Sequence, residues 1–219
     1  MKVKIQNNKK IIIMVLSMVI FLLVLKDVYY YEITSYDNWA YKVFVEDFRS
    51  NNMTIIMKFF TFLGSGLFIV SSLTLMILFF KNKRDSLLAI LNVVIVFLLN
   101  NILKIIVQRP RPSGFNLITE SNYSFPSGHS MISTAFYGFF MYLIYKNVKN
   151  NKLKYTLMSL LFLLIVLICI SRIYLGVHYL SDTLAGFFIS LSYLMIFISL
   201  IPKLTRRMKN AKEKEKVKN

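Results

Sequence analysis

The side chains best suited to chemistry fall into three short clusters in the second half of the chain. The first two read Lys104-Ile-Ile-Val-Gln-Arg109-Pro110-Arg111-Pro112 and Pro126-Ser127-Gly128-His129, and the third runs from Ser171 and Arg172 to His178 and Asp182. Both histidines of the chain lie in these clusters. Guanidinium groups match phosphate oxygens, and an imidazole beside a carboxylate can act as nucleophile or base. The clusters therefore predict a site that handles phosphate.

The cations of these clusters outnumber the acids. Lys104 and Arg111 are seven positions apart, close to two helical turns, so both can project from one face of a helix that the prolines then end. Arg109 and Arg172 add two more cations, against the single carboxylate of Asp182. Such an excess of positive charge is expected to bind a dianion.

The two histidines are placed to act on that dianion. Ser127 and Gly128 stand at the expected start of a helix, where unpaired backbone N–H groups bind anions, and His129 follows directly. His178 and Asp182 are four positions apart, so on a helix they share a face. The carboxylate can accept a hydrogen bond from one ring nitrogen and leave the other free to attack or to take a proton.

The elements that must position these residues are strongly apolar. Hydrophobic residues make up 56% of the 219 residues and the mean hydropathy is +0.57, an excess that a soluble globule of this size cannot bury. The same apolar content, with only 17% charged residues, excludes disorder. Six stretches are long enough to cross a bilayer as helices: 11–31, 55–80, 86–107, 129–145, 155–174 and 183–202. We expect one all-α domain over 1–219, with six transmembrane helices and its core motifs at 104–182.

Membrane topology, rather than nucleic-acid binding, explains the net charge of +17. Most of the 27 Lys and Arg residues lie in four segments, which are 1–10, 81–85, 146–154 and 203–219. The positive-inside rule places these segments and both termini in the cytoplasm, with 203–219 as a basic tail against anionic lipid. The three clusters then meet outside, at the outer ends of spans three to six. No small-x-small motif follows the first apolar run, so we expect an uncleaved first span in the plasma membrane.

Taken singly, each feature of the clusters has a simpler interpretation. A cation at the end of a span is often an interfacial anchor, and a lone histidine often serves only the structure. The segment 109–112 could be no more than a stiff basic loop. Their meeting at one face of the membrane favours a common site over three separate coincidences.

Three further segments concern packing. Apolar residues at helical spacing in 32–52 would share one face of a short helix on the outer interface: Ala40, Tyr41, Phe44, Val45 and Phe48. A gate for lipid is the alternative interpretation of that segment. Gly64-Ser65-Gly66 lies inside the second span, where small residues allow close contact between helices. The serine and threonine residues of 129–145 suit a helix buried in the bundle.

The chain offers few metal ligands. Cys169 is the only cysteine, which excludes an internal disulfide and a cysteine-based metal cluster. Once His178 and Asp182 pair with each other, His129 is left without companions for a dedicated metal site. We expect an enzyme that uses neither a metal nor another cofactor.

The three clusters resemble the three-part signature of the type-2 phosphatidic acid phosphatase superfamily, which is K-x6-R-P, P-S-G-H and S-R-x5-H-x3-D. All three parts match, in order, within residues 104–182. The six-span layout is similar to that of the integral-membrane branch of this superfamily. The resemblance implies metal-independent hydrolysis of lipid phosphate esters or diphosphates through a phosphohistidine.

The resemblance also implies a role for each matching residue. His178 is the nucleophile, Asp182 orients it, and His129 protonates the leaving oxygen. Five residues hold the phosphoryl oxygens: Lys104, Arg111, Ser127, Gly128 and Arg172. Arg109 lies outside the signature as an auxiliary residue, and Ser171 matches the signature but is expected only to support the site.

We expect a membrane lipid phosphatase acting on phosphatidylglycerophosphate, phosphatidic acid or undecaprenyl diphosphate. Its partners are the lipid substrate and the bilayer, with no obligate protein partner. A lipid phosphotransferase on the same scaffold is one alternative. An anion transporter or channel is another, but it would carry polar residues through mid-span and inverted repeats, which the sequence lacks.

Overall fold

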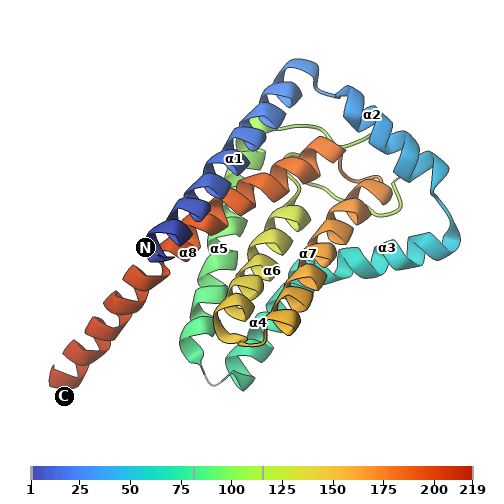
Figure 1. The fold of residues 1–219 in the computed structure, drawn as a ribbon. Coiled ribbons are helices and arrows are strands. Elements are labelled where there is room, and N and C mark those ends of the chain that lie inside the picture. Colours follow the sequence, from blue (N-terminus) through green and yellow to red (C-terminus); the bar gives the residue numbers. More distant parts are fainter. Residues whose placement is uncertain (1, 81, 115, 219) are drawn as a thin grey trace.

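The computed structural model describes the backbone of residues 2–80, 82–114 and 116–218, and the side chains of 8–80, 82–114 and 116–202. Within this part of the chain every regular element is helical (Figure 1). The helices are α1 (Lys2–Tyr31), α2 (Ser35–Tyr41), the π-helix η1 (Lys42–Asp47), α3 (Asn51–Leu63), α4 (Gly66–Phe79), α5 (Lys83–Val107), α6 (Gly128–Asn147), α7 (Asn151–Tyr174) and α8 (Leu180–Lys218). The prediction of an all-α fold is confirmed for these residues.

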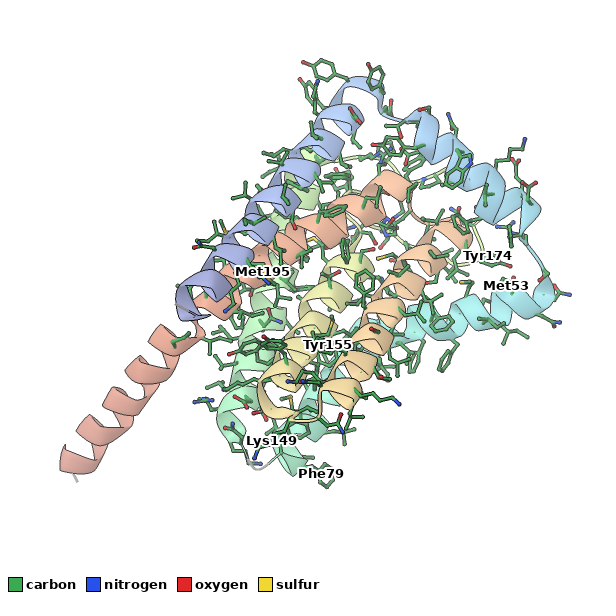
Figure 2. The ribbon with its side chains drawn as sticks, in the orientation of Figure 1. Met53, Phe79, Lys149, Tyr155, Tyr174 and Met195 are labelled. Carbon is green, nitrogen blue, oxygen red and sulfur yellow. The ribbon has the colours of Figure 1, made fainter. Side chains whose placement is uncertain are left out.

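Several of the described helices are long and apolar enough to cross a membrane. Four qualify alone, namely α1, α5, α7 and α8 as far as Pro202, and the bent pair of α3 and α4 gives up to five. Their apolar side chains cover the outside of the bundle as well as its inside (Figure 2). Ile105 and Ile106 of α5, for example, are 65% and 71% exposed. Large apolar faces of this kind are expected to contact lipid tails.

Helix α6 lies in the middle of the bundle, between α5, α7 and α8 (Figure 1). Its 20 residues span about 30 Å. Three small polar side chains are buried on it: Ser130, Ser133 and Thr134. Asn92 of α5 donates a hydrogen bond to the carbonyl of Ala135 at 2.8 Å. The prediction of a buried helix over 129–145 is therefore confirmed.

The second apolar stretch, expected as one span over 55–80, is broken into two helices whose axes differ by 48°. Gly64 lies at the break in close contact with α7 and α6. A Cβ built on Gly64 would lie 2.6 Å from Ile168 and 2.9 Å from the hydroxyl of Ser133. Gly66 has no such neighbour within 4 Å. Close packing is thus confirmed at Gly64, and the prediction is wrong for Gly66.

The outer segment 32–52 is helical, but its apolar face differs from the predicted one. α2 runs into η1, whose wider π turns shift the register of the following residues. Ala40 and Val45 are buried, whereas Phe48 is 59% exposed, so its predicted position on the apolar face is wrong. The buried side packs against α8 and α7, and it includes Asp37. α2 therefore belongs to the packed bundle and contributes a buried carboxylate to it.

Four helix ends that carry the three clusters meet at one end of the bundle. α5 and α7 end there, and α6 and α8 begin there. Gln108 (φ 50°) and Gly176 (φ 76°) adopt left-handed conformations and turn the chain away from α5 and α7. Arg111 and His178 consequently lie outside the helices, and their predicted helical positions are wrong. Both residues nevertheless reach the common site through the connecting segments.

Candidate active site

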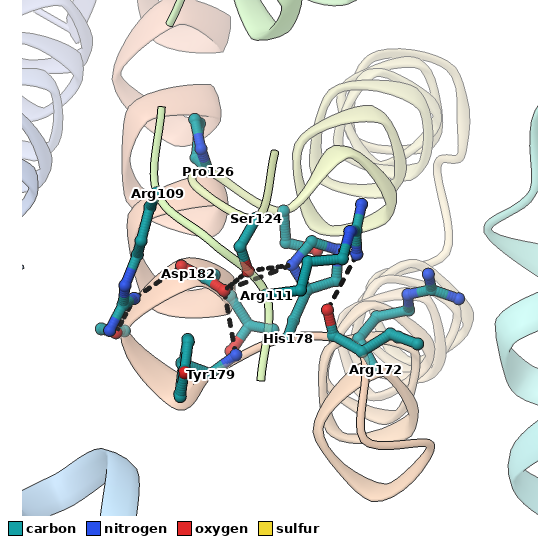
Figure 3. A network of polar contacts seen from close by, with 12 residues as sticks. Arg109, Arg111, Ser124, Pro126, Arg172, His178, Tyr179 and Asp182 are labelled. Carbon is teal, nitrogen blue, oxygen red and sulfur yellow. Dashed lines mark hydrogen bonds and ion pairs between the residues drawn. The ribbon is translucent and has the colours of Figure 1, made fainter. Parts of the chain in front are cut away.

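The three sequence clusters come together where these helix ends meet (Figure 3). The described residues of the connection between α5 and α6, 108–114 and 116–127, lie against residues 175–179, which connect α7 to α8. Backbone contacts join the two connections, since Leu117 N–H donates to the carbonyl of Leu175 at 3.0 Å. A hollow of about 570 Å³ opens beside them, and its lining consists of Pro110, Arg111, Glu120, Ser121, Asn122 and Tyr123. The site is therefore assembled from four helix ends and two connections.

His178 and Asp182 face each other, as their spacing predicts. Nδ1 of His178 lies 3.3 Å from Oδ2 of Asp182, and both side chains are buried. The same oxygen accepts hydrogen bonds from the hydroxyl of Ser124 and, at 2.9 Å, from the backbone N–H of Tyr179. These donors hold the carboxylate in place. The carboxylate in turn keeps Nδ1–H directed toward it and leaves the lone pair on Nε2.

The Nε2 atom of His178 can act as a nucleophile at neutral pH. Its neighbour is Nη1 of Arg111 at 3.2 Å, which donates to the ring. Burial lowers the pKa of His178 to about 4, and the charges of Arg172 and Arg111 act in the same direction against the opposing effect of Asp182. The ring is therefore uncharged at neutral pH, and an uncharged imidazole can attack phosphorus.

Two of the three predicted phosphate-binding cations contact the carbonyls of the loop that forms the hollow. Lys104 donates to the carbonyl of Tyr123. Arg111 donates to the carbonyl of Asn122 at 2.6 Å and to that of Tyr123 at 3.4 Å. Both cations thus converge on the same short segment, although Arg111 lies beyond the end of α5. Their predicted proximity is confirmed, and the predicted common helix is not.

Arg172, the third cation, is almost fully buried and pairs with Glu120. Its Nη2 lies 2.5 Å from Oε1 of Glu120, and its Nη1 donates to the hydroxyl of Thr61 at 2.6 Å. Oε2 of Glu120 lies 3.9 Å from Arg111. Burial acts to raise the pKa of Glu120, but the charges of Arg172 and Arg111 outweigh it and lower that pKa. An ionised carboxylate therefore lies between two cations that the resemblance assigns to phosphate.

Ser127, Gly128 and His129 form the start of α6, as predicted. The hydroxyl of Ser127 accepts a hydrogen bond from the N–H of Ser130 at 3.5 Å and caps the helix. The N–H of Ser127 is not free for an anion, because it donates to the carbonyl of Asp182 at 3.0 Å, and the prediction is wrong on this point. The N–H groups of Gly128 and His129 have no acceptor within the described part of the chain.

Close approaches fix the residues around His129. A Cβ built on Gly128 would lie 3.1 Å from Oδ1 of Asn100, whose amide donates to the carbonyl of Pro126 at 3.0 Å. The ring of His129 lies near the break between α3 and α4, since its Cδ2 is 3.4 Å from the position of a Cβ on Gly64. The two histidines of the chain therefore approach the site from different elements.

Arg109 and Ser171, predicted as auxiliary residues, are both buried. Nη1 of Arg109 lies 2.6 Å from Oδ1 of Asp182, and its Nη2 lies 3.0 Å from Oδ2 of Asp37. Ser171 is fully buried and donates to the carbonyl of Ile168 at 2.7 Å within α7. Arg109 thus contacts the carboxylate that faces His178, whereas the hydrogen bond of the Ser171 hydroxyl stays within its own helix.

Sequence reasoning did not single out three residues that contact the site, which are Ser124, Thr61 and Asp37. Ser124 lies two positions before Pro126. A hydroxyl this close to a motif is a weak indication that the residue contacts the site. Thr61 lies in an apolar stretch without any distinguishing feature. Asp37 had the clearest signal, because a carboxylate in a largely apolar segment needs a partner when it is buried.

Known proteins share both the sequence and the fold of this chain. The model of the PAP2 superfamily matches residues 82–206. Phosphatidylglycerophosphatase B of Bacillus subtilis (strain 168) is 35% identical over 150 residues, which cover 65% of this chain and 71% of that protein. Sphingosine-1-phosphate phosphatase 1 of Mus musculus is 34% identical over 113 residues, which cover 49% of this chain and 26% of that protein.

Two crystal structures are similar to this fold. The transmembrane PAP2 type phosphatidylglycerolphosphate phosphatase from Bacillus subtilis gives a TM-score of 0.79 at 30% identity and covers 87% of this chain and 96% of that chain. LpxE of Aquifex aeolicus gives a TM-score of 0.60 at 24% identity, which concerns the fold alone. The chain belongs to the PAP2 superfamily. Within it, the protein is a membrane lipid phosphatase similar over most of its length to the Bacillus enzyme.

Proposed function

We propose that the protein hydrolyses the phosphomonoester of a glycerolipid, with phosphatidylglycerophosphate as its first substrate. Phosphatidic acid and undecaprenyl diphosphate are the next candidates. The observation that carries the proposal is the placement of the His178 ring between Oδ2 of Asp182 at 3.3 Å and Nη1 of Arg111 at 3.2 Å. The similarity to phosphatidylglycerophosphatase B over 71% of that enzyme supports the choice of the first substrate.

The reaction has two half-reactions. In the first, Nε2 of His178 attacks phosphorus, the P–O bond to the lipid breaks, and His129 gives its proton to the departing oxygen. The ring of His178 then carries a positive charge, which the carboxylate of Asp182 stabilises across 3.3 Å. In the second, water attacks phosphorus while His129 takes its proton, the N–P bond breaks, and inorganic phosphate leaves.

Positioning and charge stabilisation supply most of the catalysis of phosphoryl transfer. Three cations neutralise the phosphoryl oxygens: Lys104, Arg111 and Arg172. The free N–H of Gly128 at the start of α6 and the hydroxyl of Ser127 add hydrogen-bond donors. The cations contact loop carbonyls and Glu120, so the substrate phosphate exchanges with these groups when it enters.

A substrate panel tests this function. Protein purified in detergent should release inorganic phosphate from the lipid phosphates named above, with the highest kcat/KM for phosphatidylglycerophosphate. The ranking is decided with the three lipids at equal mole fraction in the same micelles. A higher kcat/KM for undecaprenyl diphosphate would overturn the choice of substrate, and no phosphate release from any of them would overturn the proposed function.

Phosphate release should survive an excess of EDTA. Three protein cations neutralise the phosphate in the proposed mechanism, and within the described residues no three His, Cys, Asp or Glu side chains lie together as a metal site. The measurement is the initial rate before and after prolonged chelation. Loss of activity that Mg²⁺ or Zn²⁺ restores would contradict the mechanism.

We propose that the whole chain 1–219 is one domain that crosses the plasma membrane six times, with α3 and α4 as one bent span and α6 as the central one. Both termini would be cytoplasmic and the site would face outward. The charge distribution supports this orientation, because the basic connections 82–85 and 146–154 lie at the end of the bundle opposite the site (Figure 1).

Thiol labelling in intact cells tests the orientation. The cysteine of Ser121→Cys should react with an impermeant reagent, whereas that of Lys149→Cys should react only after the membrane is opened. Both positions are exposed, and the length of α6 separates them, because Ser121 lies before its start and Lys149 after its end (Figure 2). A Cys169→Ala background removes the native thiol. The reverse order of labelling would place the site in the cytoplasm.

A further inference from the structure

A buried ion network behind Asp182 reaches α2, which lies outside every sequence motif. Nη1 of Arg109 lies 2.6 Å from Oδ1 of Asp182, and Nη2 lies 3.0 Å from Oδ2 of Asp37. Ser181 bridges Arg109 and Asp37. Its hydroxyl accepts a hydrogen bond from Arg109 at 2.6 Å and donates one to Asp37 at 2.8 Å. The side chains of Arg109, Asp37 and Asp182 are 2%, 0% and 0% exposed.

Backbone contacts fix this network on both sides. Oδ1 of Asp37 accepts the N–H of Ser181 at 2.8 Å in the first turn of α8, and Oδ2 accepts the N–H of Thr34 at 3.2 Å at the start of α2. The guanidinium of Arg109 lies 4.1 Å from the centre of the Tyr179 ring. The carboxylate of Asp37 therefore ties the corner between α1 and α2 to the element that carries Asp182.

We propose that Asp37 and Arg109 are positioning residues of the phosphatase, which hold the carboxylate of Asp182 in the orientation that His178 requires and set the charge it presents to the ring. Arg109 meets Asp182 at Oδ1, the oxygen that does not face His178, and Asp37 lies on the other side of Arg109, so both act through Asp182 rather than on the substrate. The inference rests on the proposed function, in which His178 is the nucleophile.

The two oxygens of Asp182 have separate tasks. Oδ2 faces the ring of His178, whereas Oδ1 accepts a hydrogen bond from Arg109. The charge of Arg109 weakens the carboxylate as a base, so the proton stays on Nδ1 of the ring when Nε2 attacks. Asp37 balances the charge of Arg109. Without Asp37, the buried guanidinium would have Asp182 as its sole carboxylate partner and would lower the basicity of Asp182 further. The basicity of the Asp182 carboxylate thus depends on both Arg109 and Asp37.

The charged and titratable groups that face His178 come from several elements. They are Lys104 on α5, Arg111 and Glu120 in 108–127, His129 on α6, Arg172 on α7 and Asp182 on α8, with Arg109 and Asp37 behind the last. Changes at Arg109 or Asp37 alter the charge behind Asp182 and leave every phosphate-binding group in place. This separation makes the inference testable.

The test is the pH dependence of kcat/KM. Arg109→Gln removes a positive charge, so the acid limb set by His178 should move up by about one pH unit, toward the ordinary histidine pKa near 6.5. Adding Asp37→Asn removes the compensating negative charge and should move the limb back toward the wild type. Asp37→Asn alone should lower kcat about 10–100-fold with KM changed by less than about 2-fold, and it should not raise the acid limb.

Asp27→Asn is the matched control, at the same outer corner. Its carboxylate accepts from Tyr36 at 3.5 Å and does not contact Arg109, so kcat and the acid limb should stay at wild-type values. If Arg109→Gln does not fold, the comparison of Asp37→Asn with Asp27→Asn decides. Three results would overturn the inference. Asp37→Asn could keep the wild-type kcat, or it could change KM alone. In the third, adding Asp37→Asn to Arg109→Gln would move the acid limb further up instead of back. A wild-type protein that releases no phosphate would instead overturn the proposed function.

Discussion

The His178→Ala variant should show no turnover of any substrate and no covalent phosphoenzyme. His178 is the ring that has Arg111 at 3.2 Å on one side and a carboxylate at 3.3 Å on the other, so its loss removes the attacking atom itself. The effect should not depend on the leaving group. A rapid-quench experiment with p-nitrophenyl phosphate measures the burst of p-nitrophenol and the acid-labile phosphate on the protein together. A burst retained in this variant would contradict the assignment.

The His129→Ala variant is the matched comparison, because it removes the other histidine of the site. It should lose about 10²–10⁴-fold on a lipid monophosphate, the usual range for general acid catalysis. Phosphoenzyme formation from p-nitrophenyl phosphate should fall much less, since p-nitrophenolate departs without a proton. The phosphohistidine should then accumulate, because His129 also activates the attacking water. Equal losses for the two substrates would show that His129 is not the general acid.

The Asp182→Asn variant should lose about 10⁴-fold in kcat, as do hydrolases in which the aspartate behind a catalytic histidine becomes asparagine. An amide N–H in place of Oδ2 would donate to Nδ1 of His178, and the ring proton would then move to Nε2 and block its lone pair. An amide oxygen at that position would leave an N–H facing the guanidinium of Arg109. Steady-state rates on a lipid monophosphate and on p-nitrophenyl phosphate should fall together, because the nucleophile itself is disabled.

Asp85→Asn is the control for this substitution. Asp85 is also a buried aspartate, 8% exposed, and it pairs with Arg84 at 3.3 Å at the opposite end of the bundle. Its kcat should equal that of the wild type in the same detergent, and size-exclusion profiles should show whether each variant stays folded. A kcat for a folded Asp182→Asn protein within about tenfold of the wild type would refute its role in orienting the ring.

Local features of the sequence were enough to predict the helical class, several long apolar helices and the meeting of the three clusters at one end of the bundle. A run of about 20 apolar residues predicts a membrane-spanning helix from local composition alone, without knowledge of the segments that pack against it. The pairing of His178 with Asp182 also follows from short-range geometry, because four positions of chain keep the two side chains within reach. The contacts of Lys104 and Arg111 with one carbonyl show that the grouping of the cations was predictable, too.

Register and helix ends were less predictable, because they depend on contacts between distant segments. The small residues at Gly64 predicted a close helix contact there, but the bend itself was not predicted, because it forms where α6 and α7 lie against the backbone. The π turns of η1 shift the side chains before Phe48, so an α-helical periodicity misplaces it. The left-handed turn at Gln108 ends α5 before Arg111, which a spacing of seven could not reveal.

By itself, the amino-acid sequence determined which side chains are candidates for binding phosphate, since residue type and spacing decide charge, nucleophilicity and membrane placement. Only the tertiary structure decided which charged residues pair with these side chains. The two terminal nitrogens of Arg109 pair with different carboxylates, Asp182 and Asp37, because Asp37, 72 positions away in the chain, packs against the start of α8. Glu120 lies on Arg172 because two connections cross at the helix ends. Such pairs form where buried charges find partners across the fold, and sequence distance carries no information about them.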